Sequence, residues 1–434
     1  MSNTFSRRGM LAVSTAALAA MGLSACGDDA KPTSATTSDG TGVTGQTVRV
    51  WFMEGSISDE AISLLETTFA QENEGNVLKV EIQPWDGIVA KMQTALASDK
   101  ECPDLIETGN TQSSIFSSVG AFAQVDDMYD TLGGADLIPS FIEAGTWDGK
   151  LYALPLYAGA RGVFYRKDLI EAAGLSEPKT LDEFADTVIE LGKANPENVP
   201  GFSGMYLAAV DQHSANSLFF AGGGEFATMD GGTWVQQLTA PQSISAIKRI
   251  QRLFNEGTAY ALDSQAAQTA FEKYFNDAKV GVLVATDNVG GKISDELWDA
   301  DKVGVMAIPG LKEGEIGHSF AGGSNISLPT KSQNPELARK ALEIIFAEDF
   351  QILVAKDGWV PGNVTYGKEA TGRMGPLQAE IVADAKLTPN TPQWGVATSN
   401  NLIRDFYTAL AQGNEVEATA AEYGQKIEDI LNSK

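Results

Sequence analysis

The chain has 434 residues, of which 43% are hydrophobic and 44 are glycine, and its 57 acidic and 31 basic side chains give a formal net charge of −26. Such an acidic surface repels nucleic acid and anionic lipid headgroups, so we expect no nucleic-acid partner. Beyond one apolar segment near its start, the sequence has no second long apolar run, and its length favours a globular protein of two domains.

That apolar segment, residues 10–25, has the order of a secretory signal. It follows Arg7 and Arg8, contains no ionisable side chain, and is shorter than the roughly 20 residues that a membrane-spanning helix needs. Its end, Leu23-Ser24-Ala25-Cys26, resembles the bacterial lipobox, in which the cysteine is diacylated and the chain is cut before it. We therefore expect residues 1–25 to be a lipoprotein signal peptide and Cys26 to carry lipid. An apolar run that merely ends in cysteine is the alternative.

The following segment, residues 26–45, is typical of a flexible tether. It has almost no apolar side chains, and a flexible chain of that length spans roughly 25 Å. Without residues 1–25 the chain keeps 29 basic and 57 acidic side chains, a net charge of −28. We expect the protein to be held on the extracellular face of a bacterial, Gram-positive cell membrane by its lipid alone. The paired arginines also suit a twin-arginine signal, so the export route stays open.

Strand and helix patterns alternate after the tether. The order is a strand at Thr47–Met53, a helix capped by Ser58, a strand at Leu78–Gln83, a helix at Asp86–Ser98 and a strand at Pro103–Glu107. This alternation predicts parallel strands joined by right-handed crossovers, which is a doubly wound α/β domain.

Similar patterns return later in the chain. Thr180–Glu183 has the capping-box pattern of a helix that continues to about residue 194, and Asn334-Pro335 predicts another helix start. Lys279–Ala285 and Lys302–Ile308 are predicted strands. Cys102 is expected to be a small buried hydrophobic residue.

The sequence does not indicate catalytic chemistry. The two histidines, His213 and His318, lie far apart, and no His, Cys or carboxylate cluster has metal-ligand spacing. We expect no metal, no cofactor and no catalytic residue. A glycosidase needs only two suitably spaced carboxylates, so a secreted glycosidase stays open as an alternative.

Three central segments carry a family resemblance. Asp148–Tyr157, Arg161–Asp168 and Gly174–Phe184 resemble the central signature of the extracellular solute-binding proteins of sugar ABC importers, of the maltose-binding type. In that family the pattern runs Gly-Lys-x-Tyr-Ala-x-Pro, then Tyr-x-Lys-Asp-Leu, then Pro-x-Thr-x-Asp/Glu-Glu. Further segments follow in family order, so the resemblance covers essentially all of the chain after the tether.

Two further segments narrow the resemblance. Gln83–Asp86 and Glu107–Gln112 are similar to actinobacterial members that import chito- and gluco-oligosaccharides.

The chain also departs from its relatives. Thr286-Asp287-Asn288 stands where the relatives commonly have Gly-Pro-Trp. The segment between Tyr157 and Tyr165 contains Arg161 and no acidic residue. The contacts to sugar hydroxyls are therefore expected to differ.

The resemblance implies a two-lobed periplasmic-binding-protein fold of type II. Each lobe is a doubly wound sheet with helices, and the chain crosses the hinge between the lobes three times. The implied segments are 46–157 plus 324–358 for lobe 1, 162–320 plus 359–434 for lobe 2, and 156–162, 320–324 and 357–359 for the hinge.

A sugar site needs polar side chains for the hydroxyls and aromatic rings for the apolar faces. Candidates at expected strand ends and hinge positions meet that need, although Trp85 could instead staple a helix to the sheet and Asp287-Asn288 could only end a strand. The predicted ligand-binding residues are Glu54, Ser56, Trp85, Asn110, Thr111, Tyr157, Arg161, Asp287, Asn288, Asn325, Trp359 and Trp394.

The expected function is therefore that of a lipid-anchored, monomeric binding protein. It would capture an oligosaccharide by closing its lobes and deliver it to the permease subunits of an ABC transporter. A non-sugar solute, such as glycerol-phosphate or a polyamine, is the alternative within the same class.

Overall fold

The computed structural model describes residues 44–263 and 271–433. The predicted signal peptide, the lipidation site at Cys26 and the tether up to residue 43 lie outside the described residues. No helix in the described ranges is long and apolar enough to cross a membrane.

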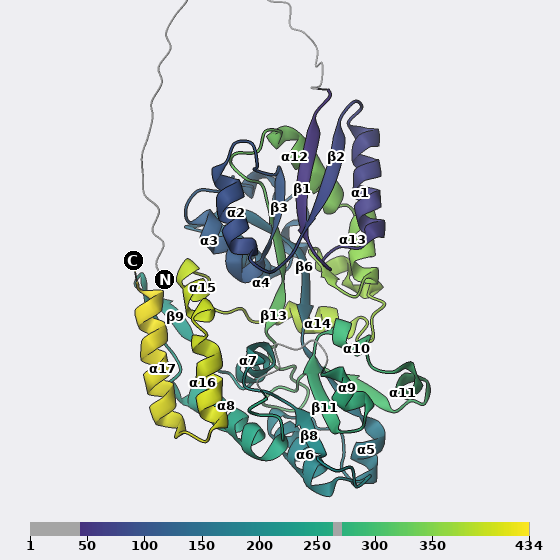
Figure 1. Ribbon diagram of the computed structural model, residues 1–434, viewed down its shortest axis with the longest axis vertical. Helices are drawn as coiled ribbons and strands as arrows, with labels where there is room; N and C mark the ends of the chain where they lie inside the picture. Colours follow the sequence, from purple (N-terminus) through teal and green to yellow (C-terminus); the bar gives the residue numbers. More distant parts are fainter. Residues whose placement is uncertain (1–43, 264–270, 434) are drawn as a thin grey trace, which may run out of the picture. The chain divides into compact units, whose positions relative to one another are not determined.

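The first sheet begins with the predicted alternation of strands and helices. β1 (Thr47–Met53) pairs in parallel with β2 (Val77–Gln83) and with β3 (Leu105–Gly109). α1 (Asp59–Glu72) and α2 (Ile88–Ala97) make the two connections, and Figure 1 shows these five elements together. Parallel pairing brings the carboxyl ends of all three strands to one edge of the sheet.

Three later strands complete this sheet in the order β14-β6-β13-β3-β1-β2. β13 (Ala321–Ser327) lies antiparallel between β3 and β6 (Ala153–Ala160), and β14 (Val360–Pro361) pairs antiparallel with β6. The sheet is mixed, not purely parallel, because the chain leaves it and returns to it. At Pro361 the chain still belongs to the first sheet, beyond the crossing predicted at 357–359. The other lobe limits stay predictions.

The second sheet has four strands in the order β12-β7-β11-β8. β7 (Gly162–Arg166) is antiparallel to both of its neighbours, β11 (Val280–Ala285) and β12 (Val303–Met306), whereas β8 (Ser203–Tyr206) is parallel to β11. One residue, Arg161, separates β6 of the first sheet from β7 of the second. The two sheets define the two lobes of the fold.

Helices pack against both sheets. Those of the first lobe are α1, α2, α3 (Ser113–Ser117), α4 (Pro139–Gly145), α12 (Pro335–Ile345) and α13 (Glu348–Lys356). Those near the second sheet are α5 (Lys167–Ala172), α6 (Leu181–Ala194), α7 (Gln212–Ala221), α8 (Pro241–Arg252), α9 (Glu272–Asn276), α10 (Asp287–Gly290) and α11 (Asp295–Asp299). The chain ends in α14 (Leu377–Ala383), α15 (Pro392–Ser399), α16 (Leu402–Ala411) and α17 (Val416–Leu431), of which α16 and α17 lie side by side (Figure 1).

Short elements occupy the connections. They are the hairpins β4 (Thr146–Trp147) with β5 (Lys150–Leu151) and β9 (Ala227–Asp230) with β10 (Thr233–Gln236), and the single turns η1 (Asn110–Gln112), η2 (Asp126–Met128), η3 (Gly134–Asp136), η4 (Leu253–Gly257) and η5 (Val364–Glu369).

The predicted helix starts are confirmed, although their hydrogen bonds differ in detail. The Ser58 hydroxyl accepts from the backbone N–H of Ala61 at 3.3 Å, and Thr180 Oγ1 accepts from the N–H of Glu183 at 3.2 Å. The Glu183 carboxylate in turn accepts from the N–H of Lys179, one residue earlier than a capping box requires. Asn334 stands at the start of α12 but makes no side-chain cap bond there.

Candidate functional site

A cavity of about 640 Å³ lies where strands of the two sheets end. The segments after β1, β3 and β11, together with β6 and the Arg161 junction, contribute residues to its lining. In open α/β sheets, ligands bind at the carboxyl ends of strands, because loops and helix N-termini converge there. The cavity therefore occupies the position where this fold is expected to bind a ligand.

An aromatic pair forms one wall of the cavity. The rings of Tyr157 and Trp359 have their centroids 4.7 Å apart and are tilted by 39°. Gly159 allows this approach, because a Cβ atom at that position would lie 2.9 Å from Cζ3 of Trp359. The predicted aromatic side chain Trp85 also lines the cavity and is 41% exposed. These rings are suited to the apolar faces of a sugar.

A second ring pair lines the cavity from the other lobe. The imidazole of His213 stacks on the ring of Phe320 with centroids 5.0 Å apart and an interplanar angle of 18°. Desolvation by the surrounding protein, and secondarily the nearby charge of Arg161, lowers the pKa of His213 to about 4, although the side chain keeps an exposed face. The imidazole is therefore neutral near pH 7 and offers a flat, uncharged surface.

Arg161 places a cation at the junction between the sheets. Its backbone is fixed at both ends by Ser319, whose hydroxyl accepts from the Arg161 N–H at 3.1 Å and donates to the Arg161 carbonyl at 2.9 Å. Burial lowers the pKa of the guanidinium, and the charge of Asp211 partly opposes this effect. The nearby Asp211 carboxylate accepts from both N–H and hydroxyl of Ser214 at the start of α7. The guanidinium can thus offer donors to a ligand in the cavity.

Nine of the twelve predicted site residues line this cavity. They are Glu54, Ser56, Trp85, Asn110, Thr111, Tyr157, Arg161, Asn288 and Trp359. The amide of Asn110 is already engaged, since its Nδ2 donates to the Ala321 carbonyl at 3.1 Å and its Oδ1 accepts from the Thr111 N–H at 2.9 Å. Asn110 therefore shapes the cavity and has little hydrogen-bonding capacity left for a ligand.

The structure places Asp287 and Asn325 outside the cavity, so we correct their assignment. Asp287 is 5% exposed, and its carboxylate accepts from the Met374 N–H at 2.6 Å. Asn325 is fully buried in β13, where its Nδ2 donates to the Phe141 carbonyl at 2.9 Å. Both side chains join structural segments to each other and do not face a ligand.

Trp394 is likewise removed from the candidate site. It is 2% exposed and packs against Phe226, with ring centroids 5.1 Å apart, in the hydrophobic core of the second lobe. The indole on α15 therefore belongs to the core and does not line the cavity.

Several cavity residues were not predicted from the sequence. They are Gln112, His213, Thr286, Phe320 and Ser324, with Gly55, Gly109, Gly159, Gly322 and Gly323. Gln112 and Thr286 are sequence neighbours of predicted residues, so a wider window around each strand end would have included them. The sequence raises His213 only as a candidate metal ligand or triad histidine, and no local signal predicts its stacking on Phe320.

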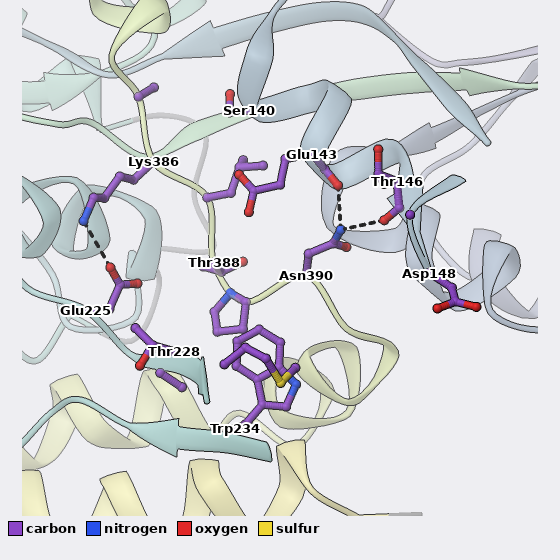
Figure 2. Close-up of a pocket in the computed structure, with 16 residues that line it drawn as sticks. Ser140, Glu143, Thr146, Asp148, Glu225, Thr228, Trp234, Lys386, Thr388 and Asn390 are labelled. Carbon is purple, nitrogen blue, oxygen red and sulfur yellow. Dashed lines mark hydrogen bonds and ion pairs between the residues drawn. The ribbon is translucent and has the colours of Figure 1, made fainter. Parts of the chain in front are cut away.

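A second cavity, also of about 640 Å³, lies elsewhere on the molecule (Figure 2). There Asn390 Nδ2 donates to the backbone oxygens of Glu143 at 2.7 Å and Thr146 at 3.2 Å, and Lys386 pairs with Glu225 at 3.1 Å. None of the predicted site residues lines it, and several of its polar groups already pair with one another. We therefore take the first cavity as the candidate site. Among the described residues, no three His, Cys, Asp or Glu side chains are grouped to hold a metal ion.

Comparison with known proteins gives concordant results. The family model for the bacterial extracellular solute-binding protein matches residues 54–352. The diacetylchitobiose-binding protein DasA of Streptomyces coelicolor is 28% identical over 425 residues, which cover 95% of each chain. The maltodextrin-binding protein MdxE of Bacillus subtilis is 25% identical over 398 residues, 88% of each chain.

Solved structures share the fold at lower identity. The sugar-binding protein MalE of Xanthomonas citri has a TM-score of 0.78 at 20% identity, with 89% of this chain and 97% of that chain covered. The GacH receptor of Streptomyces glaucescens has a TM-score of 0.73 at 20% identity, with 91% and 100% covered.

Proposed function

The chain belongs to the bacterial extracellular solute-binding protein family, and from this membership we propose that it captures an oligosaccharide and delivers it to the permease of an ABC importer. The observation that supports a sugar most directly is the cavity wall of Tyr157 and Trp359, which lies beside polar groups at the ends of strands. The combination of rings and hydroxyl-binding groups suits a ligand with apolar faces and a polar edge.

Among oligosaccharides, short chito-oligosaccharides are the first candidates. The relative that is 28% identical over 95% of both chains is a diacetylchitobiose-binding protein, whereas a 25% identical relative binds maltodextrin. The resemblance of residues 83–86 and 107–112 includes both chito- and gluco-oligosaccharide importers, so the order of preference comes from the relatives. We therefore propose diacetylchitobiose before a maltodextrin as the ligand.

The mechanism we propose is capture by lobe closure. The cavity takes side chains from both lobes, among them Tyr157 from the first and His213 from the second. A ligand that contacts both lobes only when they are shut stabilises the closed state by its differential affinity. No covalent chemistry is required, and the relatives are binding proteins rather than enzymes.

Lipid anchoring through Cys26, a monomeric state and a Gram-positive cell surface complete the proposal. The lipid anchor is supported by the lipobox-like residues 23–26 and by the polar composition of the residues that follow them. Two acyl chains hold a protein on a membrane more stably than one, which is what the resembled modification supplies.

Thermal-shift measurements on residues 27–434 test the ligand class. Diacetylchitobiose, maltotriose, spermidine and glycerol 3-phosphate would be compared at equal concentrations, since a ligand that binds only the folded chain raises its melting temperature. We expect a shift with an oligosaccharide. A shift with spermidine or glycerol 3-phosphate alone would overturn the sugar assignment.

Catalysis is tested separately. The protein would be incubated with the oligosaccharide that produces the shift, and the products would be analysed by mass spectrometry. We expect the chain length to stay unchanged, whereas shortened products would establish the glycosidase alternative.

A further inference from the structure

A carboxyl group lies buried directly beneath the cavity. Glu107, in β3, is fully buried, and its Oε2 accepts from the backbone N–H of Met53 at 2.8 Å. Its Oε1 accepts from the hydroxyl of Ser56 at 2.7 Å and from the hydroxyl of Tyr157 at 3.1 Å. Ser56 and Tyr157 both line the cavity, so Glu107 contacts the wall from behind.

Glu107 has no positive partner in the part of the chain that the structure describes. Within residues 44–263 and 271–433, none of the ion pairs includes it, and the titratable side chain that contacts it is Tyr157 of β6. Desolvation raises the pKa of this carboxyl, and hydrogen bonds from Ser324, Met53, Ser56 and Tyr157 only partly oppose that effect. A buried charge without a counterion destabilises a fold, so stability alone does not account for a carboxylate at this position.

The hydroxyl protons around Glu107 can be counted. Ser56, Tyr157 and Ser324 each have one hydroxyl proton. When Glu107 is ionised, Ser56 and Tyr157 donate to it, and Ser324 donates either to Glu107 or to the Tyr157 oxygen at 3.1 Å. All three protons then point into the protein. Ser56 and Tyr157 present only lone pairs to the cavity.

A proton on Glu107 would reverse this arrangement at one position. The carboxylic acid must donate its proton to a neighbouring oxygen, and the Ser56 and Tyr157 oxygens are the nearest acceptors in the described network. The hydroxyl that accepts this proton can no longer donate to the same oxygen, so its own proton turns either toward the other hydroxyl, since the Ser56 and Tyr157 oxygens lie 2.8 Å apart, or toward the cavity. In the second orientation the wall offers a donor in place of an acceptor.

We propose that Glu107 is a positioning residue that keeps the Ser56 and Tyr157 hydroxyls as hydrogen-bond acceptors, so that this wall selects a ligand hydroxyl that donates. This inference rests on the proposed function, because it takes the ligand to be a sugar with free hydroxyl groups. Glu107 acts through the wall without touching the ligand.

The first test is the affinity for diacetylchitobiose, measured by calorimetry between about pH 4.5 and pH 8. We expect the wild-type affinity to be weaker at the acid end of this range than at pH 8, because the raised pKa of Glu107 favours its protonated form in acid. Glu107→Gln should bind about tenfold more weakly near pH 8, and its affinity should change less with pH. The reason is that the glutamine oxygen takes over the hydrogen bond from Met53, so that the amide group donates toward Ser56 and Tyr157. Equal affinity and an unchanged profile in Glu107→Gln would overturn the inference.

Glu272→Gln is the matched control. Glu272 is also a buried carboxyl, at 9% exposure, but it does not line the cavity. It should keep the wild-type affinity and pH profile. Tyr157→Phe provides a second variant if Glu107→Gln folds poorly, because it keeps the ring beside Trp359 and removes the hydroxyl; it should also flatten the profile.

A measurement without ligand separates this inference from the proposed function. The tryptophans would be replaced by fluorotryptophan, and the fluorine NMR signal of residue 359 would be identified as the one that is missing from Trp359→Phe. This signal reports on the ring that packs against Tyr157. Its fluorine NMR shift should titrate with Glu107 in the wild type and stay constant in Glu107→Gln. If the shift titrates but no saccharide binds, the proposed function fails and the coupling of Glu107 to the wall stands. If the shift does not titrate, the role assigned to Glu107 is refuted.

Discussion

Trp359 lies against Tyr157 with ring centroids 4.7 Å apart, although the two residues are far apart in the sequence. Tyr157 belongs to β6, and Trp359 directly precedes β14, which pairs with β6. The strand pairing therefore brings the two rings together. Because both line the candidate site, this contact connects the fold of the first lobe to the recognition of a ligand.

Trp359→Ala should lower the affinity for the bound oligosaccharide at least tenfold, because it removes a stacking surface from the cavity wall; this is an estimate of about one to two kcal/mol. Isothermal titration calorimetry would measure the loss. Trp298→Ala is a control, since Trp298 packs against Phe164 and does not line the cavity. It should change the melting temperature and leave the affinity intact. Equal losses in both variants would contradict the stacking role.

Gly159→Ala should also weaken binding, because the added Cβ would lie 2.9 Å from Cζ3 and 3.1 Å from Cε3 of Trp359 and must displace the ring. The affinity is again the measured quantity. Gly291→Ala has the same chemistry, but the nearest atom to its Cβ would be at 3.7 Å, so it should bind as the wild type does. Unchanged affinity in Gly159→Ala would show that Trp359 can move without loss.

His213 should make the fold less stable in acid. Its pKa is lowered to about 4 in the folded chain, whereas an unfolded histidine titrates near pH 6.5. The unfolded state therefore binds this proton first, and stability falls as the pH decreases from about 6.5 to about 4. His213→Gln should reduce that loss of melting temperature. An unaltered slope in His213→Gln would show that the imidazole titrates normally.

The contribution of Glu107 to stability should depend on pH in the opposite sense to that of His213. The pKa of Glu107 is raised in the folded chain, so its contribution to stability is present below the unfolded pKa and is lost as the pH rises through the folded value. The melting temperature of Glu107→Gln relative to the wild type should therefore increase with pH. Differential scanning calorimetry at several pH values would measure it, and a relative melting temperature that falls with pH would contradict the sign.

Cys26→Ser should release the protein from the cell without affecting its site. If Cys26 carries the lipid, its loss leaves no anchor, and the protein should move from the membrane fraction to the medium. Detergent phase partitioning and the mass of the mature N-terminus would establish the modification. Ligand affinity should match that of the wild type, and a loss of binding would show that the tether is not separate from function.

Much of the fold could be predicted from local patterns. The Ser58 and Thr180 caps depend on contacts within a few residues, and the burial of Cys102 follows from a simple apolar preference. The parallel pairing of the first three strands follows from the alternation of strand and helix patterns, because such crossovers join parallel strands. The family resemblance, carried by the order of short motifs, is confirmed by the family match over residues 54–352.

The orientation of individual side chains could not be predicted in the same way. Asp287 and Asn288 are adjacent, yet the first is 5% exposed and bonded to Met374, whereas the second lines the cavity. Asn325 lies on a strand that has neighbours on both edges, and Trp394 packs into the core. Their surroundings come from segments distant in the sequence.

The sequence by itself determined the class of protein, the succession of strands and helices and the strand ends at which a ligand could bind, since these follow from local propensity and motif order. The tertiary structure alone decided which polar groups face the cavity, how Tyr157 meets Trp359, and that Glu107 lies beneath the wall without a counterion. The reason is physical: strand pairing and burial depend on partners from distant parts of the chain, and these partners set both the orientation and the protonation of a side chain.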